Sequence, residues 1–233
     1  MAQRRMSIDL APKVTQVLRN LASFHSQYYA VKTFGGPSLH FHRRALGLLG
    51  RVPPSAQAEL IYGVLASWGM HRMGKGGSKM VPFDVFERSV LAVRPRLTAG
   101  RKINPSSMHE SDWALLEVVF KTLKVMQSKT SIVGNSKVMA HLMPNAIAPV
   151  DREYTIKFFF GNGNITNDID KEWLLLRKIH EEFFYPIVSD ARFAKKAGKW
   201  IADQAKWPWD TSELKVADNM VIGAMKGLPD EDT

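Results

Sequence analysis

The 233-residue chain contains no cysteine. Disulfides, thiolate nucleophiles, cysteine-bound zinc and iron–sulfur clusters are therefore excluded. The seven histidines form no His-Glu-x-x-His motif, so we expect neither a metal nor another cofactor. Since disulfides belong to oxidising compartments, their exclusion agrees with a cytoplasmic location, which we expect.

Long hydrophobic runs are also absent. No stretch approaches the roughly 18 apolar residues that a membrane span requires, and the arginines near the start precede no apolar segment of the kind found in secretory signals. Alternation of apolar and polar residues, the mark of a half-buried strand, is missing throughout. We therefore expect a helical protein without a membrane partner.

Positive charge, in contrast, is plentiful and unevenly distributed. The chain has 32 lysines and arginines against 22 acidic residues, a net charge of +10. Residues 1–150 carry +13 and residues 151–233 carry −3. Such an excess favours phosphate backbones through counterion release, although it is also compatible with a merely solvated surface. Because no strongly basic amphipathic helix stands out, we expect nucleic acid, with DNA favoured, as the partner.

Apolar residues recur at intervals of three and four, which is typical of amphipathic helices. Glycine and proline turns divide the chain into predicted helices over 12–31, 38–49, 53–73, 82–93, 104–126, 129–143, 151–161, 168–188, 190–206 and 210–227. We expect Pro95 to stop one of them, and Asp210 with Glu213 to form a capping box at the start of the last. With no repeat or linker in view, the sequence predicts an all-α, irregular multi-helix globule forming a single domain over 1–233.

Two features offer weak signals for phosphate or base binding. The loop Gly74-Lys-Gly-Gly-Ser-Lys79 follows a helix and lacks the order of a P-loop, so ATP binding is not expected. It reads as a connector whose Lys75 and Lys79 could contact a phosphate. Trp207 and Trp209 could stack on a base, although packing is the more common role of tryptophan.

The most informative stretch is 132–160. It contains Gly134-Asn-Ser-Lys137 and, 14 residues after the lysine, Pro149-Val-Asp151. The pattern predicts a turn at Gly134, a short helix opened by Lys137, and a second helix capped by Asp151. Free N–H groups and the dipole at a helix start favour anions, which helps to bind phosphate and stabilises a carboxylate.

This arrangement resembles the helix–hairpin–helix DNA glycosylase superfamily, most closely its 8-oxoguanine glycosylase branch. The family has a hairpin ending in Gly-Thr-Lys and a Pro-Val-Asp motif that opens a helix, a pattern matched over about 30 residues here. One of the two usual hairpin glycines is replaced, and Glu153 stands where a histidine often follows the aspartate. Other segments, Ala66-Ser-Trp-Gly-Met70 among them, resemble a prokaryotic family of uncharacterised activity.

The resemblance implies excision of an oxidised purine from DNA. A damaged nucleotide would be flipped into a pocket, Asp151 would stabilise positive charge at C1′, and Lys137 would attack C1′ to give a Schiff base, with strand nicking by β-elimination as a possible second step. Arg152 and the hairpin residues Gly134, Asn135 and Ser136 would hold backbone phosphates.

Two alternatives remain open from the sequence. Asp151 could be only a helix cap and Lys137 a solvated lysine, which would leave a non-enzymatic nucleic-acid-binding helical protein. The second alternative is a protein-interaction domain whose charge is incidental. The placement of the two side chains relative to one cavity separates the enzyme from both.

Overall fold

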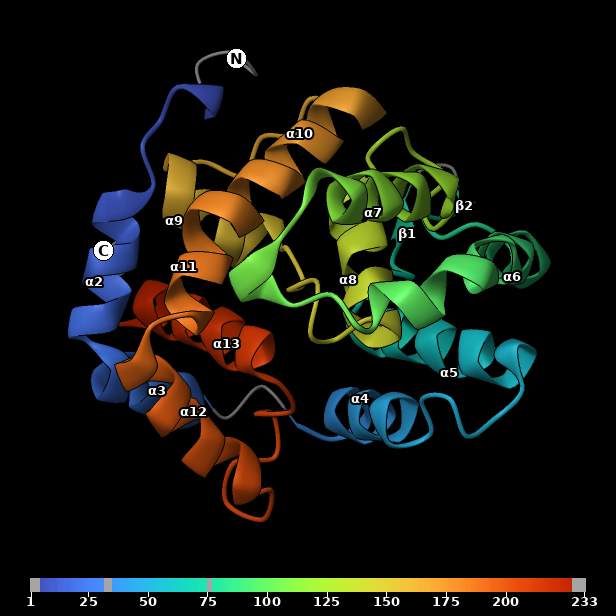
Figure 1. Ribbon diagram of the computed structural model, residues 1–233. Coiled ribbons are helices and arrows are strands. Elements are labelled where there is room, and N and C mark those ends of the chain that lie inside the picture. The colour runs from blue at the N-terminus through green and yellow to red at the C-terminus, as the bar shows by residue number, and fades with distance from the viewer. Residues whose placement is uncertain (1–4, 32–34, 75–76, 228–233) are drawn as a thin grey trace.

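The computed structural model describes residues 5–31, 35–74 and 77–227, and it confirms the predicted all-α fold (Figure 1). The helical elements are α2 (Ala11–Arg19), α3 (Leu21–Ala30), α4 (Pro37–Gly47), α5 (Pro54–Ser67), α6 (Phe83–Gly100), η1 (Pro105–Ser107), α7 (Glu110–Thr122), α8 (Ile132–Leu142), η2 (Arg152–Ile156), α9 (Lys157–Phe160), α10 (Ile169–Ile179), η3 (His180–Phe184), α11 (Tyr185–Val188), α12 (Ala191–Ala202) and α13 (Glu213–Lys226). Two strands of two residues each, β1 (Met73–Gly74) and β2 (Gly77–Ser78), form an antiparallel pair, and an isolated antiparallel bridge joins Met80 to Met126.

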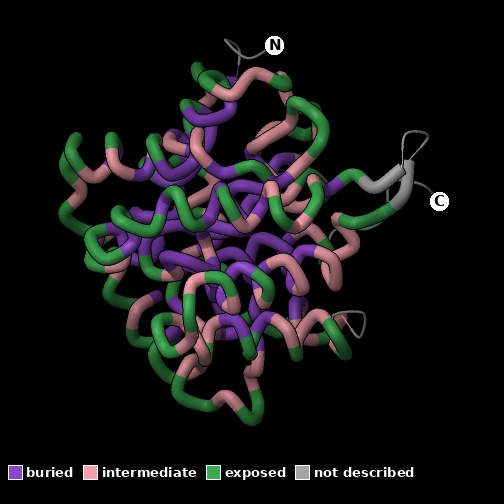
Figure 2. Tube along the Cα trace, turned by 90° about the vertical axis from the view of Figure 1, so that its right-hand side faces the viewer, coloured by how far each residue is buried: buried purple, intermediate pink, exposed green. Residues whose placement is uncertain are grey.

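Two helices, α8 and α13, lie inside the others. α8 contacts α4, α5, α7 and α10, while α13 packs against α3, α2, α11 and α12 (Figure 1). Both helices are buried along nearly their whole length, because each has apolar or small residues on every side of the helix. The buried part of the chain runs through the middle of the molecule in Figure 2. Polar residues on these two helices are therefore forced into the interior, where they must find partners.

Aspartates fix several helix starts as the sequence predicted. Asp151 accepts hydrogen bonds from Glu153 N and Tyr154 N, and Asp168 accepts them from the first turn of α10. The segment from Asp168 to Val188 is one continuous helical path, in which η3 is a π-helical turn between α10 and α11. Gly161, with φ of +70°, ends α9. These signals are local, which explains why the sequence carries them.

Other boundaries were predicted wrongly. Pro95 does not stop α6, which runs on to Gly100 because Val93 and Leu97 continue its buried face past the lost hydrogen bond. Asn20 divides the predicted 12–31 helix into α2 and α3. In the described part of the chain, no helix has the length and apolar character needed to cross a membrane.

The predicted capping box of the last helix is also wrong. Ser212 caps α13, its hydroxyl accepting from Lys215 N, and Asp210 is fully buried instead. Asp210 Oδ2 lies 2.7 Å from His25 Nε2, and its Oδ1 accepts from Asn219 Nδ2 at 2.8 Å. A buried carboxyl group is retained where it has partners of this kind, and here His25 comes from a distant part of the chain while Asn219 comes from α13 itself.

The buried imidazole of His180, on η3, should make the free energy of unfolding depend on pH. His180 Nε2 accepts from Ala148 N at 2.9 Å and Nδ1 donates to Leu176 O at 2.8 Å, which is the pattern of the neutral ring. Burial lowers the pKa of His180 to about 4. Below pH ~6.5 the unfolded chain binds a proton there that the folded chain does not, so stability falls with decreasing pH until about pH 4.

We expect His180 to contribute up to about 1.4 kcal/mol per pH unit to this loss. Urea titrations between pH 7.5 and 4.5 should show a shallower decline of the unfolding free energy for His180→Gln than for the unchanged protein. Parallel declines for the two proteins would contradict the assignment.

Candidate functional site

Lys137 lies in the middle of α8 and not at a helix start, so this part of the sequence prediction was wrong. The helix begins at Ile132 because the carboxylate of Glu172, on α10, accepts from Ser131 N at 2.6 Å and Ile132 N at 2.7 Å. A carboxylate is an effective cap at a helix start, where the free N–H groups gather. Glu172 is 40 residues away in sequence, so no local signal marked this boundary.

The residues expected to form a phosphate-binding hairpin are buried within the same helix. Gly134 packs so closely that an added Cβ would lie 2.8 Å from Val125. Asn135 Nδ2 donates to Phe120 O at 2.8 Å, and Ser136 Oγ accepts from Val150 N at 3.0 Å. The side chains of Asn135 and Ser136 are thus paired inside the protein and Gly134 is buried, so the phosphate-binding role predicted for these three residues gains no support from their placement. Ser136 instead ties α8 to the segment that carries Asp151.

The carboxylate of Asp151 has two separate roles. Its Oδ1 accepts from the backbone N–H groups of Glu153 and Tyr154, at 2.7 and 3.3 Å, and so caps η2. Its Oδ2 accepts from Lys137 Nζ at 3.0 Å. The structure thus brings together the two residues that sequence reasoning singled out as a pair.

These two side chains line one cavity of about 350 Å³. Four aromatic residues form part of its wall, among them Trp68, Tyr154 and Trp209. The full lining is Tyr28, Ser38, Ser67, Trp68, Gly69, Arg72, Lys137, Pro149, Asp151, Tyr154, Trp209, Lys215, Asp218 and Ile222. The Lys137 side chain is 9% exposed and that of Asp151 is 30% exposed, so the aspartate is the more accessible member. We call this space the lysine–aspartate cavity.

Electrostatics keep the carboxylate of this pair ionised. Burial raises the pKa of Asp151, but the charge of Lys137, its hydrogen bond and the two backbone donors outweigh burial and hold that pKa below its ordinary value. The ammonium of Lys137 also lies 5.4 Å from the centre of the Trp68 ring, within cation–π distance. An anionic oxygen and an amine therefore face one aromatic-walled space.

A second ion pair lines the same cavity, and the sequence analysis missed it. Lys215 Nζ lies 2.7 Å from Asp218 Oδ2 and also donates to Asn219 Oδ1. The ammonium lies 5.6 Å from the centre of the Tyr28 ring and 5.7 Å from that of Trp209. Burial raises the pKa of Asp218 despite the neighbouring lysine. The detectable signal was a lysine followed at i+3 and i+4 by polar residues on an otherwise apolar helix.

Two buried histidines, His141 and His42, connect α8 to α4 and to the segment before α13 through hydrogen bonds. His141 Nδ1 donates to Lys137 O at 2.7 Å, and its Nε2 accepts from His42 Nδ1 at 2.9 Å. His42 Nε2 in turn accepts from the Thr211 hydroxyl at 3.1 Å. Burial lowers the pKa of His141 to about 4, in keeping with a neutral ring. These hydrogen bonds fix the backbone of Lys137 relative to α4 and to the segment before α13.

Of the remaining described residues singled out from the sequence to contact a phosphate or a base, Trp209 alone lines this cavity. Arg152 is exposed, and its Nε donates to Gly163 O at 2.8 Å; Lys79 is exposed, and Lys75 falls outside the described residues. Trp209 lines the cavity, whereas Trp207 packs edge-on against His25. Across the described ranges no group of three or more acidic or histidine side chains is placed to hold a metal ion.

Comparisons with family models, with curated proteins and with solved structures give no match to this chain. The case for a function therefore depends on the geometry of the lysine–aspartate cavity.

Proposed function

We propose that the protein is a DNA glycosylase that excises an oxidised purine of the 8-oxoguanine kind, with a Schiff-base lyase step after excision. The observation that carries the proposal is the 3.0 Å approach of Lys137 Nζ to Asp151 Oδ2 within an aromatic-walled cavity. An amine beside a carboxylate in a concave site supplies both a nucleophile, once the amine is neutral, and a negative charge close to one sugar carbon.

The cavity suits a flipped nucleotide. A base removed from the duplex loses its stacking and regains it on aromatic side chains, at about 1–3 kcal/mol per base. Trp68, Tyr154 and Trp209 supply such rings, and Arg72 adds a cation to the lining. The buried pair Lys215 and Asp218 adds a hydrogen-bond donor and an acceptor. Hydrogen bonds from these groups to the polar edge of a base would distinguish one base from another.

The chemistry follows from the two charges. Asp151 stabilises the positive charge that develops at C1′ as the bond to the base lengthens. The neutral amine of Lys137 uses its lone pair to form a bond from Nζ to C1′, while the electron pair of the glycosidic bond leaves with the base, which takes up the proton that the ammonium gave up. The C1′–O4′ bond then breaks, O4′ keeping its electron pair and taking up the second proton from Nζ, which gives a Schiff base. Loss of a C2′ proton and departure of the 3′ phosphate by β-elimination cleave the strand.

Borohydride trapping tests the proposal. With a duplex containing 8-oxoguanine, we expect a covalent protein–DNA adduct whose yield falls by at least about a hundredfold in Lys137→Gln, since in this proposal Lys137 supplies the amine that attacks C1′. Lys178→Gln is the matched control, because Lys178 is also buried and paired with an acidic residue but lies on α10, outside the cavity lining. The control should trap normally.

The same assay separates the enzyme from a binding protein. Salt-dependent duplex binding without an adduct on any of a panel of oxidised or abasic duplexes would support a non-enzymatic nucleic-acid-binding protein. An adduct that persists in Lys137→Gln and disappears in Lys215→Gln would transfer the nucleophile to the second lysine and refute the role of Lys137.

A further inference from the structure

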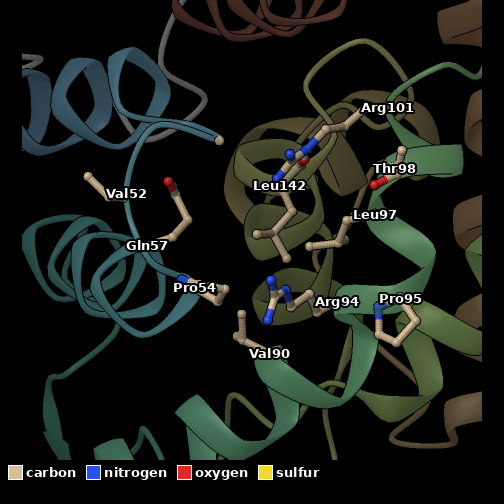
Figure 3. Close-up of a pocket in the computed structure, with 11 residues that line it drawn as sticks. Val52, Pro54, Gln57, Val90, Arg94, Pro95, Leu97, Thr98, Arg101 and Leu142 are labelled. Atoms are coloured by element: carbon tan, nitrogen blue, oxygen red, sulfur yellow. Dashed lines mark hydrogen bonds between the residues drawn. The ribbon is translucent and has the colours of Figure 1, made fainter.

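A second cavity, of about 530 Å³, lies between α5 and α6 beside the end of α8 (Figure 3). Its wall shares no residue with the lysine–aspartate cavity. Figure 3 shows Pro54 and Gln57 on one side and Arg94 with Leu97 on the other, the guanidinium of Arg94 reaching from α6 into the space between. We call it the arginine cavity.

The arginine cavity carries positive charge without a counterion. Arg94 and Arg101 line it, and none of its lining residues is acidic. Arg101 Nε donates to Leu142 O at 2.9 Å, which fixes its guanidinium, and burial lowers the pKa of Arg101. Among the described residues neither the exposed Arg94 nor the half-buried Arg101 has an ion-pair partner, whereas the buried cations Lys137, Lys178 and Lys215 are paired. Two guanidinium groups that line one cavity without a counterion are suited to an anion.

Gln57 gives the cavity a second polar feature. The residue is 4% exposed, and its Nε2 donates to Ala45 O at 3.0 Å, so the orientation of the amide is fixed. The other end, Oε1, is a buried acceptor without a hydrogen-bond partner among the described residues. Buried acceptors are nearly always paired, so this oxygen lacks a donor that a ligand would supply.

We propose that the arginine cavity binds a phosphate group, held by Arg94 and Arg101, on a ligand that also donates a hydrogen bond to Gln57 Oε1. Guanidinium groups bind phosphate oxygens through paired, charge-assisted hydrogen bonds, and the Thr98 hydroxyl is a further donor in the lining. Pro54 is the first residue of the 14-residue helix α5, whose positive dipole end faces the same space. This inference stands independently of the glycosylase proposal.

The ligand class is a phosphate ester with an N–H or O–H group nearby. Two sources share this chemistry: a free phosphorylated metabolite such as a nucleotide, and the backbone of a bound nucleic acid. The experiment below separates them.

Calorimetric titration with inorganic phosphate and with 2′-deoxyguanosine 5′-monophosphate tests the site. We expect Arg94→Gln to weaken binding of both probes by about tenfold or more, since a charge-assisted contact is lost. Arg96→Gln is the matched control: Arg96 is exposed on the same helix, as Arg94 is, but it does not line the cavity, so its loss should change affinity less than about twofold.

A second variant and a duplex arm complete the test. Thr98→Val should weaken the nucleotide while far-UV circular dichroism stays unchanged, which covers the case in which Arg94→Gln is poorly folded. Reduced duplex affinity in Arg94→Gln, beyond that of Arg96→Gln, would assign the phosphate to nucleic acid; unchanged duplex affinity would assign it to a free metabolite. Equal losses in the two arginine variants, or no phosphate binding to the unchanged protein, would overturn the proposal.

Discussion

Asp151→Asn is expected to reduce the rate of base excision by about a thousandfold, because a neutral amide cannot stabilise the positive charge that develops at C1′. The asparagine oxygen can still accept from Glu153 N and Tyr154 N, so the start of η2 should survive. The loss should therefore appear in single-turnover rates on a lesion-containing duplex, with duplex affinity changed much less.

Asp168→Asn is the matched control for this prediction. Asp168 caps α10 in the same way, accepting from Asp170 N and Lys171 N, but it does not line the lysine–aspartate cavity. Its variant should excise at the normal rate. Equal excision rates for Asp151→Asn and the unchanged protein would remove the carboxylate from the mechanism and leave Asp151 as a helix cap.

Gly223→Val is expected to destabilise the fold by about 3 kcal/mol or more. α13 crosses α3 so closely at this glycine that an added Cβ would lie 1.9 Å from Phe24 O and 3.0 Å from Tyr28 N. Both obstacles are backbone atoms, which no change of side-chain rotamer can relieve, so the helices must separate. Because Asp218 and Ile222 of α13 line the lysine–aspartate cavity, activity should fall together with stability.

Gly198→Ala provides the opposite case. Gly198 is exposed on α12, and an added Cβ there meets no atom within 4 Å. Alanine should therefore stabilise the protein by roughly 0.5–1 kcal/mol through its higher helix propensity. Urea denaturation measures both variants. A Gly223→Val protein as stable as Gly198→Ala would contradict the close crossing of α3 and α13.

Two signals in the sequence singled out Lys137 and Asp151: a helix cap at Asp151, and the resemblance to a known family. Asp151 caps its helix by accepting hydrogen bonds from the backbone N–H groups two and three residues later, and such a cap can be predicted from the sequence. The approach of Lys137 was an expectation from the resemblance, and the contact at 3.0 Å agrees with it. The route differs from the expectation, because the lysine comes from the middle of a helix capped by Glu172.

The second ion pair of the cavity shows what local reasoning cannot recover. Lys215 and Asp218 are close in sequence, and any helix brings such residues together. That their pair is buried depends on Tyr28 and Trp209, which reach it from α3 and from the loop before α13. Only the packing of α13 turns an ordinary helical pair into part of a cavity wall.

The sequence by itself determined the all-α class, most helix positions and the caps at Asp151 and Asp168, because periodicity, turns and caps act over a few residues. The tertiary structure alone decided that α6 passes Pro95, that Asn135 and Ser136 are buried, and which cations line each cavity. Those outcomes depend on contacts between residues tens to hundreds of positions apart, where the free energy gained by burial and pairing outweighs a local preference.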